Sequence, residues 1–236
     1  MKKIIAINTI AFFAATLMAA ESEDVKAAAK KLAEQKNYSW KTTVVVPEGS
    51  QFRPGPTEGK TEKEGYTWLS MSFRDNTMDA VLKGEKGAAK MEGEWRSLAE
   101  MAEEGQGMGS FMAARLRNYR TPAKEAEELA AKTKELKKEG DAFAGELTEE
   151  GAQDLLRFRG RRAGGDGPPA PKNAKGSVKF WVKDGQLAKY EYKVSGTITF
   201  NGEDRDIDRT TTTEIKDVGT TKIEVPEEAK KKLGAT

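Results

Sequence analysis

The sequence feature that most constrains the fold is a long run of alternating residues that ends at Asn201-Gly202. From residue 188 to residue 200, every even position is Ala, Tyr, Val, Gly, Ile or Phe, and every odd position is Lys, Glu, Ser or Thr. Strict alternation is typical of a strand with one buried face. Because ordinary strands contain about 3–10 residues, we expect this one to bend, and Gly196 is the natural place for the bend.

Asn-Gly is a strong signal for a two-residue hairpin turn of type I′. A shift of the second strand by one residue would place Asp204, Asp206 and Asp208 on the apolar face, where unpaired carboxylates are costly. The two-residue turn avoids that cost. The expected pairs are Phe200 with Glu203, Ile198 with Arg205, Gly196 with Ile207, Val194 with Arg209, Tyr192 with Thr211, Tyr190 with Thr213 and Ala188 with Ile215.

A second hairpin precedes the first one and shares its long strand. A three-residue loop over residues 183–185, with Gly185 in the left-handed position of a bulge, keeps the apolar residues on a common face. This loop sets Val178, Phe180 and Val182 beside Ala188, Tyr190 and Tyr192, and it leaves Trp181 and Lys179 on the outer face. One face of the resulting three-stranded sheet is therefore expected to be apolar.

The first 20 residues have the pattern of a secretory signal, because Lys2 and Lys3 precede a short apolar run that ends at Ala19-Ala20. A retained membrane anchor is the alternative, although a span needs about 20 apolar residues. Without this segment 38 basic residues balance 38 acidic ones, so the charge does not indicate nucleic acid as a partner. There is no Cys to accept a lipid anchor. We therefore expect a periplasmic or secreted protein with no stable membrane anchor after signal removal.

Residues 21–236 are expected to form a single domain. A helix capped by Ser22 is followed by strands at 38–46, 66–74, 77–83 and 88–91, with a polar loop over 47–65. A helical insertion covers about 97–159, and an Arg-, Gly- and Pro-rich flexible loop covers about 159–176. The insertion contains a helix with the stripe Met108, Phe111, Met112, Leu116 and Tyr119, a helix from Thr121-Pro122 to about Lys138, a return to the sheet at 142–147, and a helix capped by Thr148.

These patterns predict an α+β fold in which long antiparallel strands form an open barrel covered by helices. The segments "SVKFWVKDGQLAKYEYKV" and "TTTTEIKDVGTTKIEVPEEA" also resemble the closing strands of the LolA-like and LppX/LprG-like lipoprotein-carrier superfamily, mainly over residues 176–229. Pro226 lies close to the final proline of that pattern. The resemblance implies an antiparallel sheet curved into an unclosed half-barrel, capped by helices inserted mid-chain, whose cradle holds acyl chains in relatives. The chain departs from the LppX type because it has no Cys to carry a lipid.

The inner face of the predicted sheet is the candidate ligand-binding surface. Two interpretations stay open: a core whose hydroxyls bond to the backbone or to one another, and a cavity for an amphiphile. An unsatisfied buried hydroxyl costs about 1–3 kcal/mol. The cavity lining would be Tyr190, Tyr192, Val194, Ile198, Thr211 and Thr213 on the sheet and Phe111, Met112 and Leu116 on the helix. Arg205 and Arg209 point the same way, and they either lie in solvent or bind an acidic head group or side chain.

No catalytic site, cofactor or metal site is predicted. With no His and no Cys, the chain lacks Ser-His and Cys-His nucleophiles and the common zinc sites. Asp204, Asp206 and Asp208 are not followed by the Gly and Glu that a calcium loop requires. The basic patch formed by Arg157, Arg159, Arg161 and Arg162 is either solvated or in contact with an anionic lipid or polymer.

Two functions therefore stay open at this point. The first is an exported, non-enzymatic binding protein that holds or carries a lipid or another hydrophobic ligand in the half-barrel cavity. The alternative is an envelope protein-interaction or sensor module with a filled core and no small ligand. An apolar chamber of several hundred Å³ under the helix of Phe111 would favour the first, and a filled core would favour the second.

Overall fold

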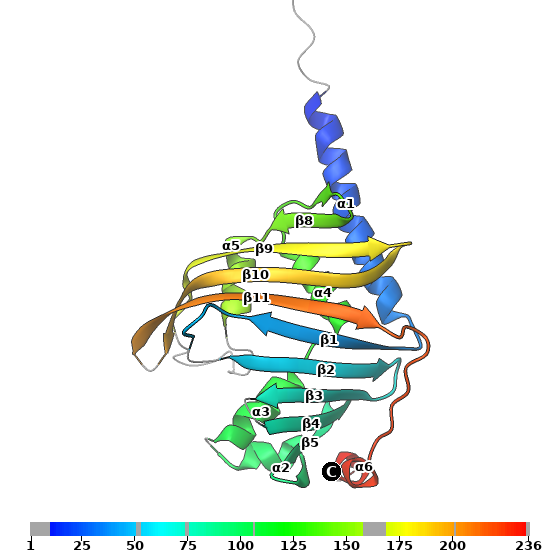
Figure 1. Cartoon of the computed structure of the whole chain (residues 1–236), viewed down its shortest axis with the longest axis vertical. Helices are drawn as coiled ribbons and strands as arrows, with labels where there is room; N and C mark the ends of the chain where they lie inside the picture. Colours follow the sequence, from blue (N-terminus) through cyan, green and yellow to red (C-terminus); the bar gives the residue numbers. More distant parts are fainter. Residues whose placement is uncertain are drawn as a thin grey trace, which may run out of the picture.

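The computed structural model describes residues 10–50, 53–73, 76–105, 107–157, 169–200 and 202–234, with side chains from residue 21 onward except those of residues 73 and 200. Over these residues the strands form one antiparallel sheet in the order β6-β5-β4-β3-β2-β1-β11-β10-β9-β8-β7 (Figure 1). The strands are β1 (Asn37–Val45), β2 (Pro54–Glu62), β3 (Thr67–Phe73), β4 (Asn76–Lys83), β5 (Lys86–Met91), β6 (Glu94–Ser97), β7 (Lys137–Glu139), β8 (Ala142–Glu146), β9 (Lys172–Lys183), β10 (Gln186–Phe200) and β11 (Glu203–Lys216).

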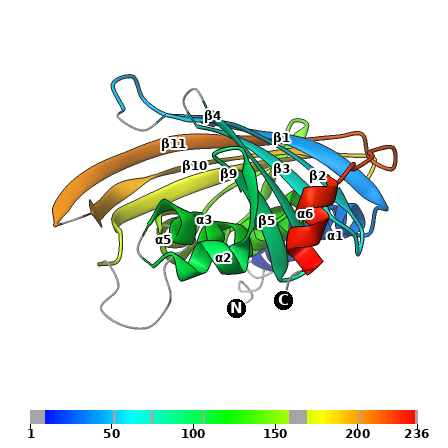
Figure 2. The same ribbon diagram turned by 90° about the horizontal axis from the view of Figure 1, so that it is seen from below.

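The sheet is arched and its two edge strands do not meet, so the barrel is open (Figure 2). Most of the described helices cover the concave face, whereas the C-terminal helix packs on the opposite face of β4–β6. The helices are α1 (Ile10–Ala33), α2 (Leu98–Glu103), α3 (Met108–Arg117), α4 (Pro122–Ala131), α5 (Glu149–Leu156) and α6 (Glu227–Gly234). This arrangement confirms the predicted fold class, an α+β half-barrel capped by helices inserted mid-chain.

The long C-terminal hairpin has the predicted register. Strands β10 and β11 pair from Phe200 with Glu203 through Tyr190 with Thr213. The bend at Gly196 also has a structural basis, because the pairing of β10 with β9 is irregular between Ser195 and Thr197. A Cβ atom at Gly196 would lie 2.6 Å from the side chain of Leu156. Glycine therefore permits α5 to approach the strand at this point.

The turn between β9 and β10 differs from the prediction, although most of the register is confirmed. Phe180 pairs with Tyr190 and Val178 with Tyr192. The turn has two residues, Asp184 and Gly185, with φ values of 53° and 68°, and the extra residue is a bulge at Ala188, between Leu187 and Lys189. Leu187 is buried and Ala188 is exposed. The predicted three-residue loop and the inward position of Ala188 were wrong. The extra residue lies in strand β10 after the turn, so the alternation of inward and outward side chains is restored there and not in the loop.

Strand β2 lies inside the segment predicted to be a polar loop, and that prediction was wrong. Pro54, Gly55 and Gly59 argue against a strand when the sequence is considered alone. In the structure β2 pairs with β1 on one side and with β3 on the other. Gly59 lies opposite Trp40, and a Cβ atom at Gly59 would be 2.1 Å from the indole ring. The small residue is there to make room for the ring.

Other boundaries of the insertion also differ. Strand β6 and helix α2 were not predicted, and α4 ends at Ala131, well before Lys138. The chain after α4 joins the sheet through a bridge between Thr133 and Leu147. Strand β9 begins at Lys172, so residues 172–176 of the predicted loop are in a strand. Residues 158–168 of that loop lie outside the described residues.

The predicted signal segment meets the first helix without a break. Helix α1 runs from Ile10, so Ser22 lies within the helix and does not cap it, contrary to the prediction. Val25, Ala28, Ala29 and Leu32 of this helix are buried. In the described part of the chain, no helix combines the length and the apolar character that crossing a membrane requires. The signal and its cleavage after residue 20 stay predictions.

Candidate functional site

The candidate residues of the sheet all lie on the concave face and are buried: Tyr190, Tyr192, Val194, Ile198, Thr211 and Thr213. The hydroxyls of Tyr190 and Thr213 have hydrogen-bond partners inside the protein. The Tyr190 hydroxyl donates to Glu125 Oε2 at 2.7 Å, and the hydroxyls of Thr213 and Thr42 are 2.9 Å apart. This half of the concave face, over β9–β11, is a packed core with internal hydrogen bonds.

Three tyrosines from several elements lie in this core, with Tyr38 and Tyr190 buried and Tyr119 partly buried. Burial, followed by the nearby Glu125 carboxylate, raises the pKa of Tyr190 well above its ordinary value. The same two causes, in the same order, raise the pKa of Tyr119. Burial also raises the pKa of Tyr38, whose ring is 5.6 Å from that of Trp40. The raised pKa values keep these phenols protonated around neutral pH.

Helix α3 does not present one continuous stripe to the sheet. Met112 and Leu116 are 4% and 1% exposed, whereas Met108 and Phe111 are 68% and 43% exposed. Met112 and Leu116 are four residues apart and share the buried side. Phe111 lies on the exposed side, and Met108, four residues before Met112, is exposed at the first position of the helix. Of the three predicted roof residues, Phe111 thus faces outward and does not cover the sheet. Contact of any of these residues with a ligand stays a prediction.

The sequence interpretation missed a concentration of methionine under α2 and α3. The chain has eight methionines, and all six that follow the predicted signal lie within residues 71–112. Met71 and Met78 are direct partners across β3 and β4. We call the six residues the methionine layer: Met71, Met78 and Met91 on the sheet, Met101 on α2, and Met108 and Met112 on α3. Their clustering along the sequence was a usable signal.

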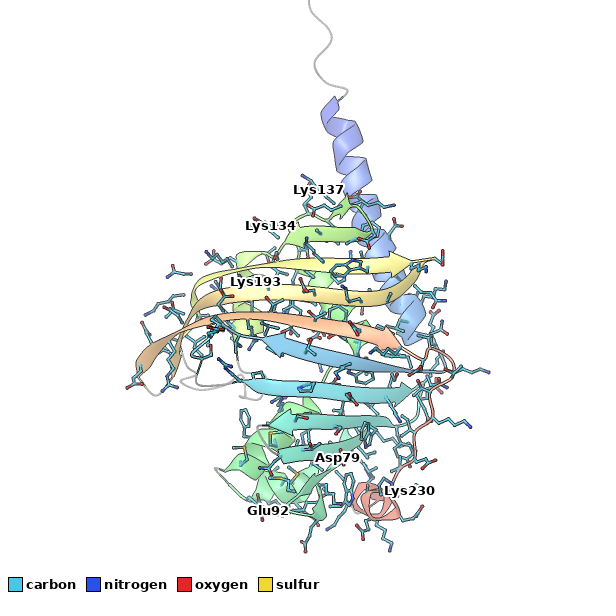
Figure 3. All side chains as sticks on the ribbon, in the orientation of Figure 1. Asp79, Glu92, Lys134, Lys137, Lys193 and Lys230 are labelled. Atoms are coloured by element: carbon cyan, nitrogen blue, oxygen red, sulfur yellow. The ribbon has the colours of Figure 1, made fainter. Side chains whose placement is uncertain are left out.

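A cavity of about 570 Å³ opens beside the methionine layer. It lies between the β5–β6 turn, where Figure 3 labels Glu92, and the start of α3. Arg96 and Glu104 form an ion pair in its wall, and Gly109 leaves space for the Glu104 carboxylate. The cavity lining is Met91, Glu92, Glu94, Arg96, Glu104, Met108 and Gly109. The lining is mostly polar, and Met91 and Met108 contribute its two large apolar side chains.

The two candidate arginines have different surroundings. Arg205 is exposed and forms an ion pair with Glu203. Arg209 is half-buried, and its guanidinium donates to the Leu155 carbonyl near the end of α5. A cation at a helix C-terminus is favourable. Arg209 therefore has a structural partner, and binding of a head group by either arginine stays a prediction.

The other charged features are paired where they are described. Asp204 accepts from Thr199 and from Lys172, and these hydrogen bonds, with that of Thr199 the stronger, lower the pKa of its carboxyl. Arg157 pairs with Asp154, while Arg159, Arg161 and Arg162 lie outside the described residues. Among the residues that the structure describes, no group of acidic side chains is arranged to hold a metal ion.

Comparisons with known proteins find similar solved structures. No protein-family model matches the chain, and no curated protein matches it. The lipoprotein LppX of Mycobacterium tuberculosis aligns at 8% identity with a TM-score of 0.46, covering 88% of this chain and 99% of that one. LprF of Mycobacterium bovis aligns at 10% identity with a TM-score of 0.47, covering 89% and 98%. A LolA superfamily protein of Nitrosomonas europaea aligns at 11% identity with a TM-score of 0.34, covering 86% and 94%.

These structures carry the names of the superfamily that the C-terminal segment resembles. Their TM-scores are below 0.5, and nothing about a ligand or mechanism of this chain follows from them. What the site can do rests on the geometry of this chain.

Proposed function

We propose that this protein is an exported, non-enzymatic binding protein that holds the apolar chain of a lipid or similar amphiphile between its curved sheet and helices α2 and α3. The observation that carries the proposal is the methionine layer beside the cavity. Methionine is unbranched and has three rotatable side-chain bonds, so it repacks around irregular or variable apolar partners. A wall of this kind suits a site that must admit chains of different lengths.

The two halves of the concave face differ, and this difference sets where a ligand would enter. Over β9–β11 the core is filled and Tyr190 is hydrogen-bonded, which taken alone favours the alternative function without a small ligand. Over β3–β5 the buried methionines belong to the same packed core, and of the methionine layer only Met91 and Met108 line the cavity. The cavity lies beside the start of α3 and not under Phe111. An acyl chain would therefore enter next to Met91 and Met108 and reach Met112 and Leu116 before the tyrosines.

The location of the protein follows from its N-terminal pattern. A segment with the pattern of a secretory signal precedes residue 21, and the chain has no Cys for a lipid anchor. We place the mature protein in the periplasm or outside the cell, where it would meet lipids or an envelope protein. N-terminal sequencing of the exported protein would locate the cleavage site.

Native mass spectrometry of the exported protein, before and after organic extraction, tests for a bound lipid. If the protein is purified without a bound lipid, uptake of the fluorescent fatty acid cis-parinaric acid tests binding. Displacement by oleic acid is the control for specificity. A fatty acid with a photoreactive diazirine on its chain would locate the site, and we expect labelled peptides within residues 71–116. The absence of both co-purified lipid and uptake would contradict the proposal and favour the module with a filled core.

A further inference from the structure

Helix α6 and the first turn of α2 lie on opposite faces of the sheet and are joined around its edge. Ala229 and Leu233 of α6 are buried against Val81, Ala88 and Trp95 on the convex side. Leu98 and Met101 of α2 belong to the core on the concave side. Strand β6 is the edge strand between them. The Lys232 Nζ atom reaches around this edge and lies 2.7 Å from Glu100 Oε1.

Glu100 has a second role at the same place. Its Oε2 atom accepts the backbone N–H of Ser97 at 2.7 Å, and the Ser97 hydroxyl accepts the backbone N–H of Glu100 at 3.1 Å, which forms a capping box. One carboxylate therefore binds both the start of α2 and the C-terminal helix. The hydrogen bond from Lys232, followed by the one from the Ser97 backbone, lowers the pKa of Glu100.

Helices α2 and α3 are linked by a side-chain contact. The Arg117 side chain, at the end of α3, donates to the Leu98 carbonyl at the start of α2, at 3.0 Å. A separate ion pair, Arg96 with Glu104, attaches the end of α2 to β6 and is independent of Lys232. A contact that holds the first turn of α2 therefore also restrains the helix that covers the methionine layer.

The C-terminal segment is suited to attach and detach. After β11 the chain runs without a strand along the ends of β1–β3 and then forms α6 (Figure 1). Only Ala229 and Leu233 of α6 are buried, and their apolar cluster is separate from the main core. Helix α6 contributes no strand to the sheet, so its departure would leave the strand order unchanged.

We propose that the segment from Asp217 to α6 is a strap that holds the α2–α3 cover closed, and that release of Lys232 from Glu100 opens the ligand site. This inference rests on the proposed function for its purpose, but the mechanical coupling can be tested without a ligand. Both side chains of the pair are partly exposed, so an external partner or a change in salt concentration can reach the contact.

Hydrogen–deuterium exchange of the α2 and α3 amides in the full chain tests the coupling. We expect Lys232→Ala to speed their exchange about two- to fivefold, the range that loss of a partly exposed ion pair allows. Glu100→Gln should have a similar effect while the Gln keeps the capping box. The matched control is Lys230→Ala. Lys230 is labelled on α6 in Figure 3, and among the described residues its ion pair is with Glu227 of the same helix. Exchange in α2 and α3 should not change in this variant.

The rate of cis-parinaric acid uptake by the same variants links the strap to the site. Faster uptake by Lys232→Ala and Glu100→Gln, with no change for Lys230→Ala, supports the proposal. Unchanged exchange in both strap variants, or an equal change in the Lys230 control, overturns the strap. Faster exchange with no fatty-acid binding by any form leaves the strap standing and overturns the proposed function.

Discussion

The Tyr190 hydroxyl lies 2.7 Å from Glu125 Oε2, so the longest described strand is fastened to helix α4 by one charge-assisted hydrogen bond. The bond forms in the packed core, where Tyr190 is among the largest fully buried side chains. Hydrogen bonds to charged groups in such surroundings are stronger than neutral ones. This contact explains why a tyrosine, and not a phenylalanine, stands at the centre of an apolar face.

We therefore expect Tyr190→Phe to lower the free energy of unfolding by about 1–3 kcal/mol, because it removes the hydrogen bond from the Tyr190 hydroxyl to the Glu125 carboxylate. Glu125→Gln should cost less, since the amide oxygen still accepts from Tyr190. Urea denaturation followed by circular dichroism measures both. The control is Tyr66→Phe on the outer face, where the ring contacts Lys83 and packs at the α6 cluster, and we expect a change within about 0.5 kcal/mol. Equal losses for Tyr66→Phe and Tyr190→Phe would contradict this role.

The raised pKa values of Tyr38, Tyr119 and Tyr190 predict how stability depends on alkaline pH. A group whose pKa is higher in the folded state favours folding below its unfolded pKa, and this contribution is lost as the pH rises toward the folded value. Since an unfolded tyrosine ionises near pH 10, stability should fall progressively above about pH 10. Phenolate absorbance and circular dichroism, recorded together, measure ionisation and unfolding. Full ionisation of the five tyrosines near pH 10 in a protein that keeps its native spectrum would refute the prediction.

The hairpin could be predicted from the sequence because its determinants are local. Alternation sets which side chains face inward, and Asn201-Gly202 sets the register, so the predicted pairing of Tyr190 with Thr213 is confirmed. The β9–β10 turn shows the limit of that reasoning. A bulge at Ala188 and a longer loop restore the same alternation, and the two differ only in where the extra residue lies along the folded strand.

Strand β2 and the methionine layer could not be derived in the same way, because long-range contacts determine them. Gly59 is in a strand because β1 and β3 flank it and the ring of Trp40 needs the space. The methionines come from three strands and two helices, and only the folded chain shows that they share one layer. Their grouping within residues 71–112 was visible in the sequence, but the stripe of Phe111 and Met112 pointed to one helix alone.

The close approach of Gly59 to Trp40 predicts that Gly59→Ala destabilises the protein. The added methyl group would lie 2.1 Å from the indole ring, and Trp40 is only 2% exposed, so the ring has little freedom to move. Overpacking of this kind costs about 1–3 kcal/mol. Thermal unfolding measures the loss. Gly234→Ala is the matched control because a methyl group there meets nothing within 4 Å. A Gly59→Ala loss no larger than that of the control would show that the ring can give way.

The methionine layer makes a prediction about oxidation that does not depend on mutation. Hydrogen peroxide oxidises methionine according to its exposure, so Met108 should react first, Met91 next, and the buried Met71 and Met101 last. Mass spectrometry of peptides taken at successive times measures the four rates. If a fatty acid enters beside Met91 and Met108, adding oleic acid should slow the oxidation of these two residues.

The same experiment separates entry at the cavity from binding elsewhere. A ligand between β3–β5 and α3 covers Met91 and Met108, because both line the cavity. A ligand over β9–β11 would bind near Tyr192 and Val194 and leave Met108 as reactive as before. Glycerol at the same concentration is the control, since it has no apolar chain to enter the layer. Unchanged oxidation of Met91 and Met108 in the presence of bound oleic acid would move the site away from the methionine layer and toward the tyrosines of β10.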